Sequence, residues 1–81
     1  MNELIEQHYE AIVKRGLIKP GTTDREFSKA AISELIEWTE DYETQEAIDL
    51  VAVVLNSLHH KGIDIEREFK KNINHQIERV K

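Results

Sequence analysis

Two pairs of acidic residues stand at i, i+3 spacing in the middle of the chain, Glu34 with Glu37 and Glu46 with Asp49. In a helix, residues three apart lie on the same face, so the two carboxylates of each pair are neighbours. Neighbouring carboxylates bind Mg²⁺ and Mn²⁺, because these hard cations prefer several oxygen ligands. The first chemistry that the sequence indicates is therefore the binding of a divalent cation.

The surroundings of these pairs distinguish them from acidic pairs such as Glu3 and Glu6, which we expect to be solvated surface. Asp49 interrupts the most apolar stretch of the chain, and Glu34 and Glu37 bracket two apolar residues. A carboxylate in an apolar setting is costly unless it is paired or binds a metal. A competing interpretation is that these carboxylates face solvent and form ion pairs with lysines.

Four helices are expected to position these residues. Apolar residues at helical spacing predict helices over residues 2–15, from about 24 to 40 or 41, from 45 to about 61, and from 65 to the C-terminus. Thr23 with Glu26 forms a capping box before the second helix, and Asp64 caps the fourth. The start of the third helix is less clear, with Asp41 or Thr44 as candidate caps.

The second helix is expected to be buried along much of its length, because its apolar residues form a broad stripe. The stripe comprises Phe27, Ala31, Ile32, Leu35, Ile36 and Trp38. If the second and third helices form an antiparallel hairpin, both acidic pairs lie near the same end of it and the four carboxylates converge. The predicted fold class is all-α, a four-helix bundle-like domain over residues 1–81 that assembles as an oligomer.

The composition limits the classes of protein that the chain can belong to. With 81 residues, 40% of them hydrophobic and 33% charged, it makes one small globular domain, which excludes a two-domain enzyme with its own cofactor domain. The absence of cysteine excludes disulfides, thiolate nucleophiles and iron–sulfur clusters. A net charge of −5 disfavours nucleic-acid binding, and the absence of a signal segment or apolar span predicts a cytoplasmic protein that does not bind membranes.

The order of the motifs resembles that of the MazG-like all-α nucleoside triphosphate pyrophosphohydrolases, whose signature is E-x-x-E followed by E-x-x-D. The matching segments are Glu34-Leu35-Ile36-Glu37, Glu46-Ala47-Ile48-Asp49 and, after an apolar helix, Lys61-Gly62-Ile63-Asp64-Ile65-Glu66. The resemblance extends over roughly residues 17–79, which is most of the chain.

The resemblance implies cleavage of a nucleoside triphosphate, in particular a deoxynucleotide, between the α and β phosphates to give a monophosphate and pyrophosphate. It implies that Glu34, Glu37, Glu46 and Asp49 hold Mg²⁺, or Mn²⁺ in its place. Glu34 or Glu37 would then be the catalytic group that orients or deprotonates the attacking water. The family resemblance also implies a homodimer or homotetramer, which agrees with the small core expected of so short a chain.

Three further residues are candidates for binding the substrate. Lys29 precedes the first acidic motif and Arg79 closes the last helix, and both are expected to contact phosphate. Trp38 is either a core or interface residue or a contact for the nucleobase.

Two alternative functions stay open from the sequence. One is a catalytically inactive helical oligomerisation or interaction protein of the same fold. The other is an enzyme like the phosphoribosyl-ATP pyrophosphohydrolases, although the paired lysine and double glutamate of that family are absent here, where Lys29-Ala30 and Ser33-Glu34 stand instead.

Overall fold

The computed structural model describes all 81 residues and contains four helices and no strand. The helices are α1 (Asn2–Lys14), α2 (Asp24–Asp41), α3 (Thr44–His60) and α4 (Ile65–Arg79). These bounds lie within a residue or two of those predicted, so the all-α class is confirmed. No helix has both the length and the apolar character that crossing a membrane requires.

Two of the helix starts are stabilised by the side chains that the sequence indicates. The Thr23 hydroxyl accepts a hydrogen bond from the Glu26 N–H at 3.2 Å, and the Glu26 carboxylate accepts one from the Thr23 N–H at 2.8 Å. This is the reciprocal capping box, which satisfies backbone donors at the start of α2. Asp64 caps α4 by accepting from the Arg67 N–H at 3.1 Å.

The start of α3 differs from the prediction, since neither Asp41 nor Thr44 caps it. Its N-cap is Glu43, whose side chain makes no capping hydrogen bond. Asp41 instead ends α2 and accepts a hydrogen bond from the Glu43 N–H at 3.2 Å. The tight connection requires Tyr42 to take a left-handed conformation with φ of 56°, and no glycine is present there to signal the turn.

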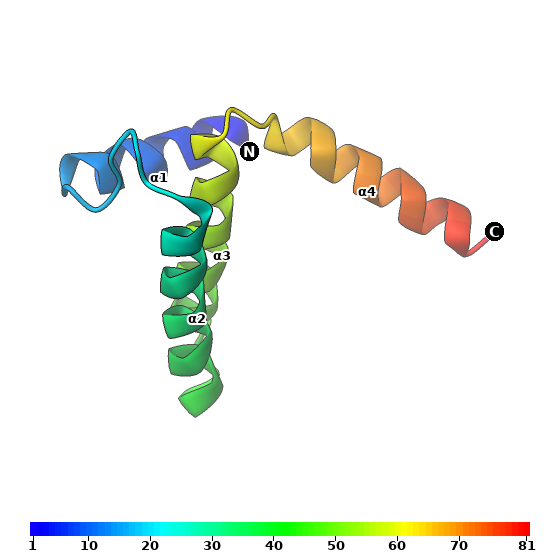
Figure 1. Cartoon of the computed structure of the whole chain (residues 1–81). Coiled ribbons are helices and arrows are strands. Elements are labelled where there is room, and N and C mark those ends of the chain that lie inside the picture. The colour runs from blue at the N-terminus through cyan, green and yellow to red at the C-terminus, as the bar shows by residue number, and fades with distance from the viewer.

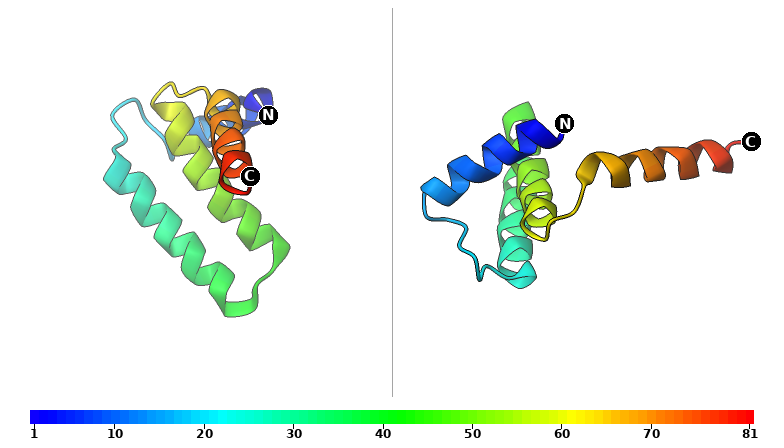
Figure 2. Two further views of the ribbon diagram at one scale, coloured as in Figure 1. Left: turned by 90° about the vertical axis from the view of Figure 1, so that its right-hand side faces the viewer. Right: turned by 90° about the horizontal axis from the view of Figure 1, so that it is seen from above.

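Helices α2 and α3 lie side by side as an antiparallel hairpin, and α1 crosses the end of the hairpin where α3 finishes (Figures 1 and 2). Tyr9 of α1 is joined there to His60 of α3 by a 2.7 Å hydrogen bond. The fourth helix extends away from the other three and meets them mainly at its first turn (Figure 1), where Ile65 is buried. It does not lie alongside α2 and α3 as in a closed bundle.

The core of the single chain is small. Only five residues are buried, namely Ile5, Ile18, Phe27, Asn56 and Ile65. The expectation that α2 is buried along much of its length is wrong for the single chain, because α3 covers one side of it and no other element covers the rest. Large apolar side chains stay exposed on all four helices, namely Leu4 and Val13 on α1, Ile32, Leu35 and Ile36 on α2, Ile48, Val51 and Val54 on α3, and Phe69, Ile73 and Ile77 on α4.

The overall dimensions also show an open chain. Its accessible surface is 6383 Å², whereas a compact monomer of 9.5 kDa exposes about 5,000 Å². Its radius of gyration is 14.2 Å, against about 12 Å for a compact domain of this length. The projecting α4 accounts for this shape (Figure 2).

Candidate functional site

An open cavity of about 390 Å³ lies between α1, α2, α3 and the loop that joins α1 to α2. Glu34 of α2 and Asp49 of α3 both line it, so the hairpin places one residue from each acidic motif in the lining of the same cavity. The volume lies within the range of about 300–1,000 Å³ that is usual for small-molecule sites. The cavity is therefore the candidate site of the chain.

Glu34 is held in an environment that disfavours its charge. Burial raises the pKa of its carboxyl above the ordinary value, and the neighbouring carboxyls of Glu37 and Asp49 raise it further. Its Oε2 atom is buried and has no hydrogen-bond partner. A carboxyl group in this position is either protonated, and so neutral, or ionised and stabilised by a nearby cation.

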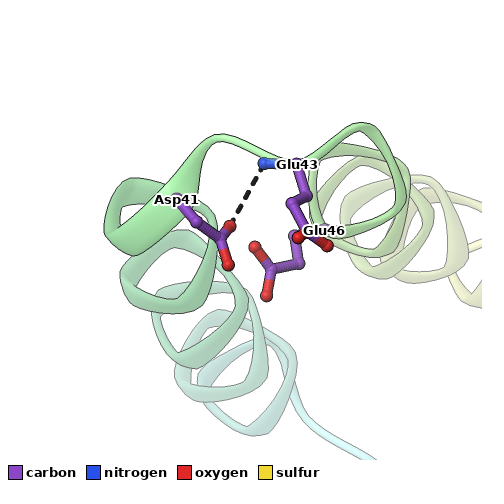
Figure 3. A group of neighbouring side chains, drawn as sticks. All are labelled: Asp41, Glu43 and Glu46. Atoms are coloured by element: carbon purple, nitrogen blue, oxygen red, sulfur yellow. Dashed lines mark hydrogen bonds between the residues drawn. The ribbon is translucent and has the colours of Figure 1, made fainter.

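Glu46 stands in a second acidic group beside the α2–α3 turn, with Asp41 and Glu43 (Figure 3). One oxygen from each of the three side chains lies within 4.8 Å of the others. Hydrogen bonding with Asp41, burial, and the charges of Asp41, Glu43 and Glu37 raise the pKa of Glu46 to about 7. The Oε2 atom of Glu46 is buried and has no hydrogen-bond partner.

Glu37 connects the two acidic groups, because its charge acts on both Glu34 and Glu46. The structure thus brings the four predicted carboxylates to the same half of the hairpin. None of them forms an ion pair with a lysine or arginine, in contrast to the competing interpretation. Asp49 accepts a hydrogen bond from Gln45 Nε2 at 3.2 Å, whereas the buried Oε2 atoms of Glu34 and Glu46 have no partner. Of the four predicted ligands, only Glu46 belongs to a group of three carboxylates whose oxygens lie within 4.8 Å of one another. Unpartnered carboxylate oxygens are the kind of ligand that Mg²⁺ prefers.

The three predicted substrate-binding residues lie outside the cavity in this chain. Lys29 is exposed on α2 and forms no ion pair. Trp38 packs edge-on against Tyr42 near the turn, with ring centroids 5.5 Å apart. Arg79 ends α4, which points away from the hairpin (Figure 1), so it does not meet the carboxylates of its own chain.

Sequence reasoning missed three polar residues that line the cavity, His8 and Arg15 of the α1 region and Asn56 of α3. Asn56 is 4% exposed and contacts His8. It interrupts the same apolar helix that made Asp49 conspicuous, so the same signal could have identified it. Nothing in the sequence indicates His8 or Arg15, because their placement depends on how α1 crosses the hairpin.

The chain was compared with protein-family models, curated proteins and solved structures, and none of them matches.

Proposed function

We propose that the chain is a Mg²⁺-dependent nucleoside triphosphate pyrophosphohydrolase of the MazG-like class, which releases a nucleoside monophosphate and pyrophosphate. The observation that carries this proposal is the placement of Glu34 and Asp49 on the wall of one cavity with no basic partner. A carboxylate pair that lacks a counter-charge and borders a cavity of ligand size suits a cation-bound polyphosphate.

The chain's own carboxylates would divide two tasks between them. Glu34, Glu37, Glu46 and Asp49 would hold Mg²⁺, which when bound offsets phosphate charge and aligns the triphosphate for attack at the α phosphorus. Glu34 is the better placed of the two candidate bases, because it lines the cavity and its raised pKa brings it closer to neutrality. A base whose pKa is near the working pH transfers protons efficiently.

Phosphate contacts would come from three basic residues. Arg15 lines the cavity and forms no ion pair, so its guanidinium is available to a phosphate oxygen. Lys29 is exposed on α2, five residues before Glu34. Arg79 would reach a substrate only from a second copy of the chain, because its own α4 points away from the cavity (Figure 1).

We further propose that the working form is a homodimer or a homotetramer. The chain exposes roughly 1,400 Å² more than a compact monomer of its mass. A stable interface buries about 800 Å² of each partner, so the excess suffices for one. The apolar residues on α4, Phe69, Ile73 and Ile77, have no partner within the chain and match the exposed apolar residues of α2 and α3 in character.

The test is pyrophosphate release from a panel of canonical and modified deoxynucleoside and ribonucleoside triphosphates, with Mg²⁺, with Mn²⁺ and with a chelator. We expect metal-dependent turnover that falls at least about 100-fold in Glu37→Gln and in Asp49→Asn. Glu40→Gln is the matched control, because Glu40 is an exposed acid of the same helix outside both acidic groups. Absence of turnover on every triphosphate would overturn the proposal and favour the inactive oligomerisation protein.

A further inference from the structure

Asn56 is the one polar residue that the fold buries, with 4% of its surface exposed. Its side chain has a single hydrogen-bonding partner in the protein, the Nδ1 atom of His8. This atom lies 3.1 Å from Asn56 Nδ2 and 3.3 Å from Asn56 Oδ1. Burying an amide costs free energy unless its donors and acceptor are hydrogen-bonded. The remaining hydrogen-bonding capacity of Asn56 therefore requires an explanation.

The capacity that remains can be counted. His8 Nδ1 either carries a proton and donates to Oδ1, or lacks one and accepts from Nδ2, so it makes only one of the two bonds. The amide starts with two N–H donors and two oxygen lone pairs. In either tautomer it keeps at least one donor and one acceptor, side by side, and Asn56 borders the cavity.

The cavity has a suitable layout for a nucleotide. Asp49 and Asn56 are seven residues apart on the same stripe of α3, two turns or about 10 Å along the helix. On α2, Glu34 and Phe27 are likewise seven residues apart and line the facing wall. The acidic end of the cavity and the end with Asn56 and Phe27 are thus separated by a distance that a nucleoside spans between its 5′ phosphate and its base.

The middle of the cavity is lined by small side chains. Ala30 of α2 and Ala52 of α3 lie between the acidic end and the Asn56 end. Larger residues at these two positions would fill the space between the helices. The alanines leave room for a sugar or a flat ring, and Phe27 supplies an apolar ring at the far end.

We propose that Asn56 is the residue that selects the nucleobase, through paired hydrogen bonds from its amide to one edge of the base. An adjacent donor and acceptor on an amide match a base edge that offers an acceptor beside a donor, as the N7 and N6 atoms of adenine do when asparagine binds them. The ligand class is a nucleoside phosphate whose phosphates lie at the Glu34 and Asp49 end. This inference rests on the proposed function, since it takes the ligand to be a nucleotide.

The test measures binding of products rather than turnover. The probes are the four deoxynucleoside 5′-monophosphates and 2-deoxyribose 5-phosphate, which lacks a base, titrated by calorimetry in the presence of Mg²⁺. We expect wild type to prefer one or two of the monophosphates. Asn56→Leu should weaken the preferred ones at least about tenfold and leave 2-deoxyribose 5-phosphate unchanged. Asn74→Leu, on exposed α4, is the control.

A second variant keeps the proposal testable if Asn56→Leu does not fold. Ala52→Leu should exclude the base while leaving the amide in place, so it should weaken monophosphates but not inorganic pyrophosphate. Equal weakening of 2-deoxyribose 5-phosphate in Asn56→Leu, or unchanged monophosphate binding in either variant, would overturn the inference.

The outcomes also separate this inference from the proposed function. Triphosphate hydrolysis without base preference, or with a preference that Asn56→Leu retains, refutes the role of Asn56 and leaves the hydrolase intact. Base-selective binding that depends on Asn56 without any hydrolysis supports the base site and refutes the hydrolase. A wild-type chain that binds none of the monophosphates refutes the inference.

Discussion

Glu34 of α2 and Asp49 of α3 line the same cavity although they are fifteen residues apart in the sequence. The pKa of Glu34 is raised mainly by burial, then by the neighbouring Glu37, and then by the charge of Asp49. The three carboxyls therefore destabilise one another when all are ionised. The hairpin holds them together without a basic residue among them. Such an arrangement costs stability in the absence of a cation, and this cost can be measured.

Removing one of these charges should stabilise the metal-free chain. We expect Glu34→Gln to raise the free energy of unfolding by on the order of 1 kcal/mol, because it removes a repelled charge and supplies a donor at a buried position. The same variant should lose most of the stabilisation that Mg²⁺ gives to wild type. Urea unfolding with Mg²⁺ and with a chelator measures both effects. A variant that is less stable without metal, and equally stabilised by it, would show that Glu34 is a structural residue.

The stability of the metal-free chain should depend on pH with a defined sign. The pKa of Glu46 is raised to about 7 and that of Glu34 is raised above 4.5, so the folded chain binds more protons than the unfolded chain between these values. The contribution of Glu46 to stability therefore falls as the pH rises from about 4.5 to about 7, and that of Glu34 falls as the pH rises from 4.5 through its own raised pKa. Unfolding at pH 5, 6, 7 and 8 measures the slope, and Glu46→Gln should flatten it. A slope unaffected by this variant would contradict the assignment.

At lower pH a different carboxyl sets the trend. Hydrogen bonds from Asn2 and from the Arg67 N–H lower the pKa of Asp64 below its ordinary value of 3.8. Its contribution to stability is present above that value and is lost as the pH falls through the lowered pKa. We expect Asp64→Ala to lower the free energy of unfolding at pH 7, because α4 loses its N-cap. Circular dichroism during urea unfolding at pH 7 would detect it, with Asp64→Asn, which can still cap, as the matched control.

The exposed apolar face of α4 should control assembly. Ile73 lies on this face, whereas the next residue, Asn74, is turned about 100° around the helix axis from it. We expect Ile73→Lys to shift wild-type oligomers to smaller species in sedimentation velocity, because a charge cannot be buried at an apolar interface. Asn74→Lys adds the same charge and should leave the oligomer intact. A monomeric wild type would refute the proposed assembly.

Metal binding can be followed without any substrate. The single tryptophan, Trp38, follows Glu37 directly and packs against Tyr42 near the second acidic group. We expect its fluorescence to change on titration with Mg²⁺ or Mn²⁺, and the apparent affinity to fall at least about tenfold in Asp49→Asn. The control is a titration with sodium chloride at the same ionic strength, without any divalent cation. A signal that sodium reproduces would indicate charge screening rather than a site.

The sequence by itself determined the local structure. Apolar residues at helical spacing predict all four helices, and Thr23 with Glu26 and Asp64 predict two of their starts, because capping depends on residues three positions apart. The turn at Tyr42 was not predictable from composition, since a non-glycine residue adopts φ of 56° there. The spacing of Glu34 with Glu37 also fixed which carboxylates share a helix face.

Only the tertiary structure decided which helix faces are covered and what borders the cavity. The apolar stripes of α2 and α4 predict burial, yet most of their residues stay exposed in the single chain, because periodicity shows which face needs a partner and not whether this chain provides one. The Nδ2 atom of Asn56 lies 3.1 Å from the Nδ1 atom of His8, although the two residues are 48 positions apart in the sequence. They come together because α1 crosses the end of the hairpin. Contacts of this range depend on how whole helices pack, and no local pattern in the sequence encodes them.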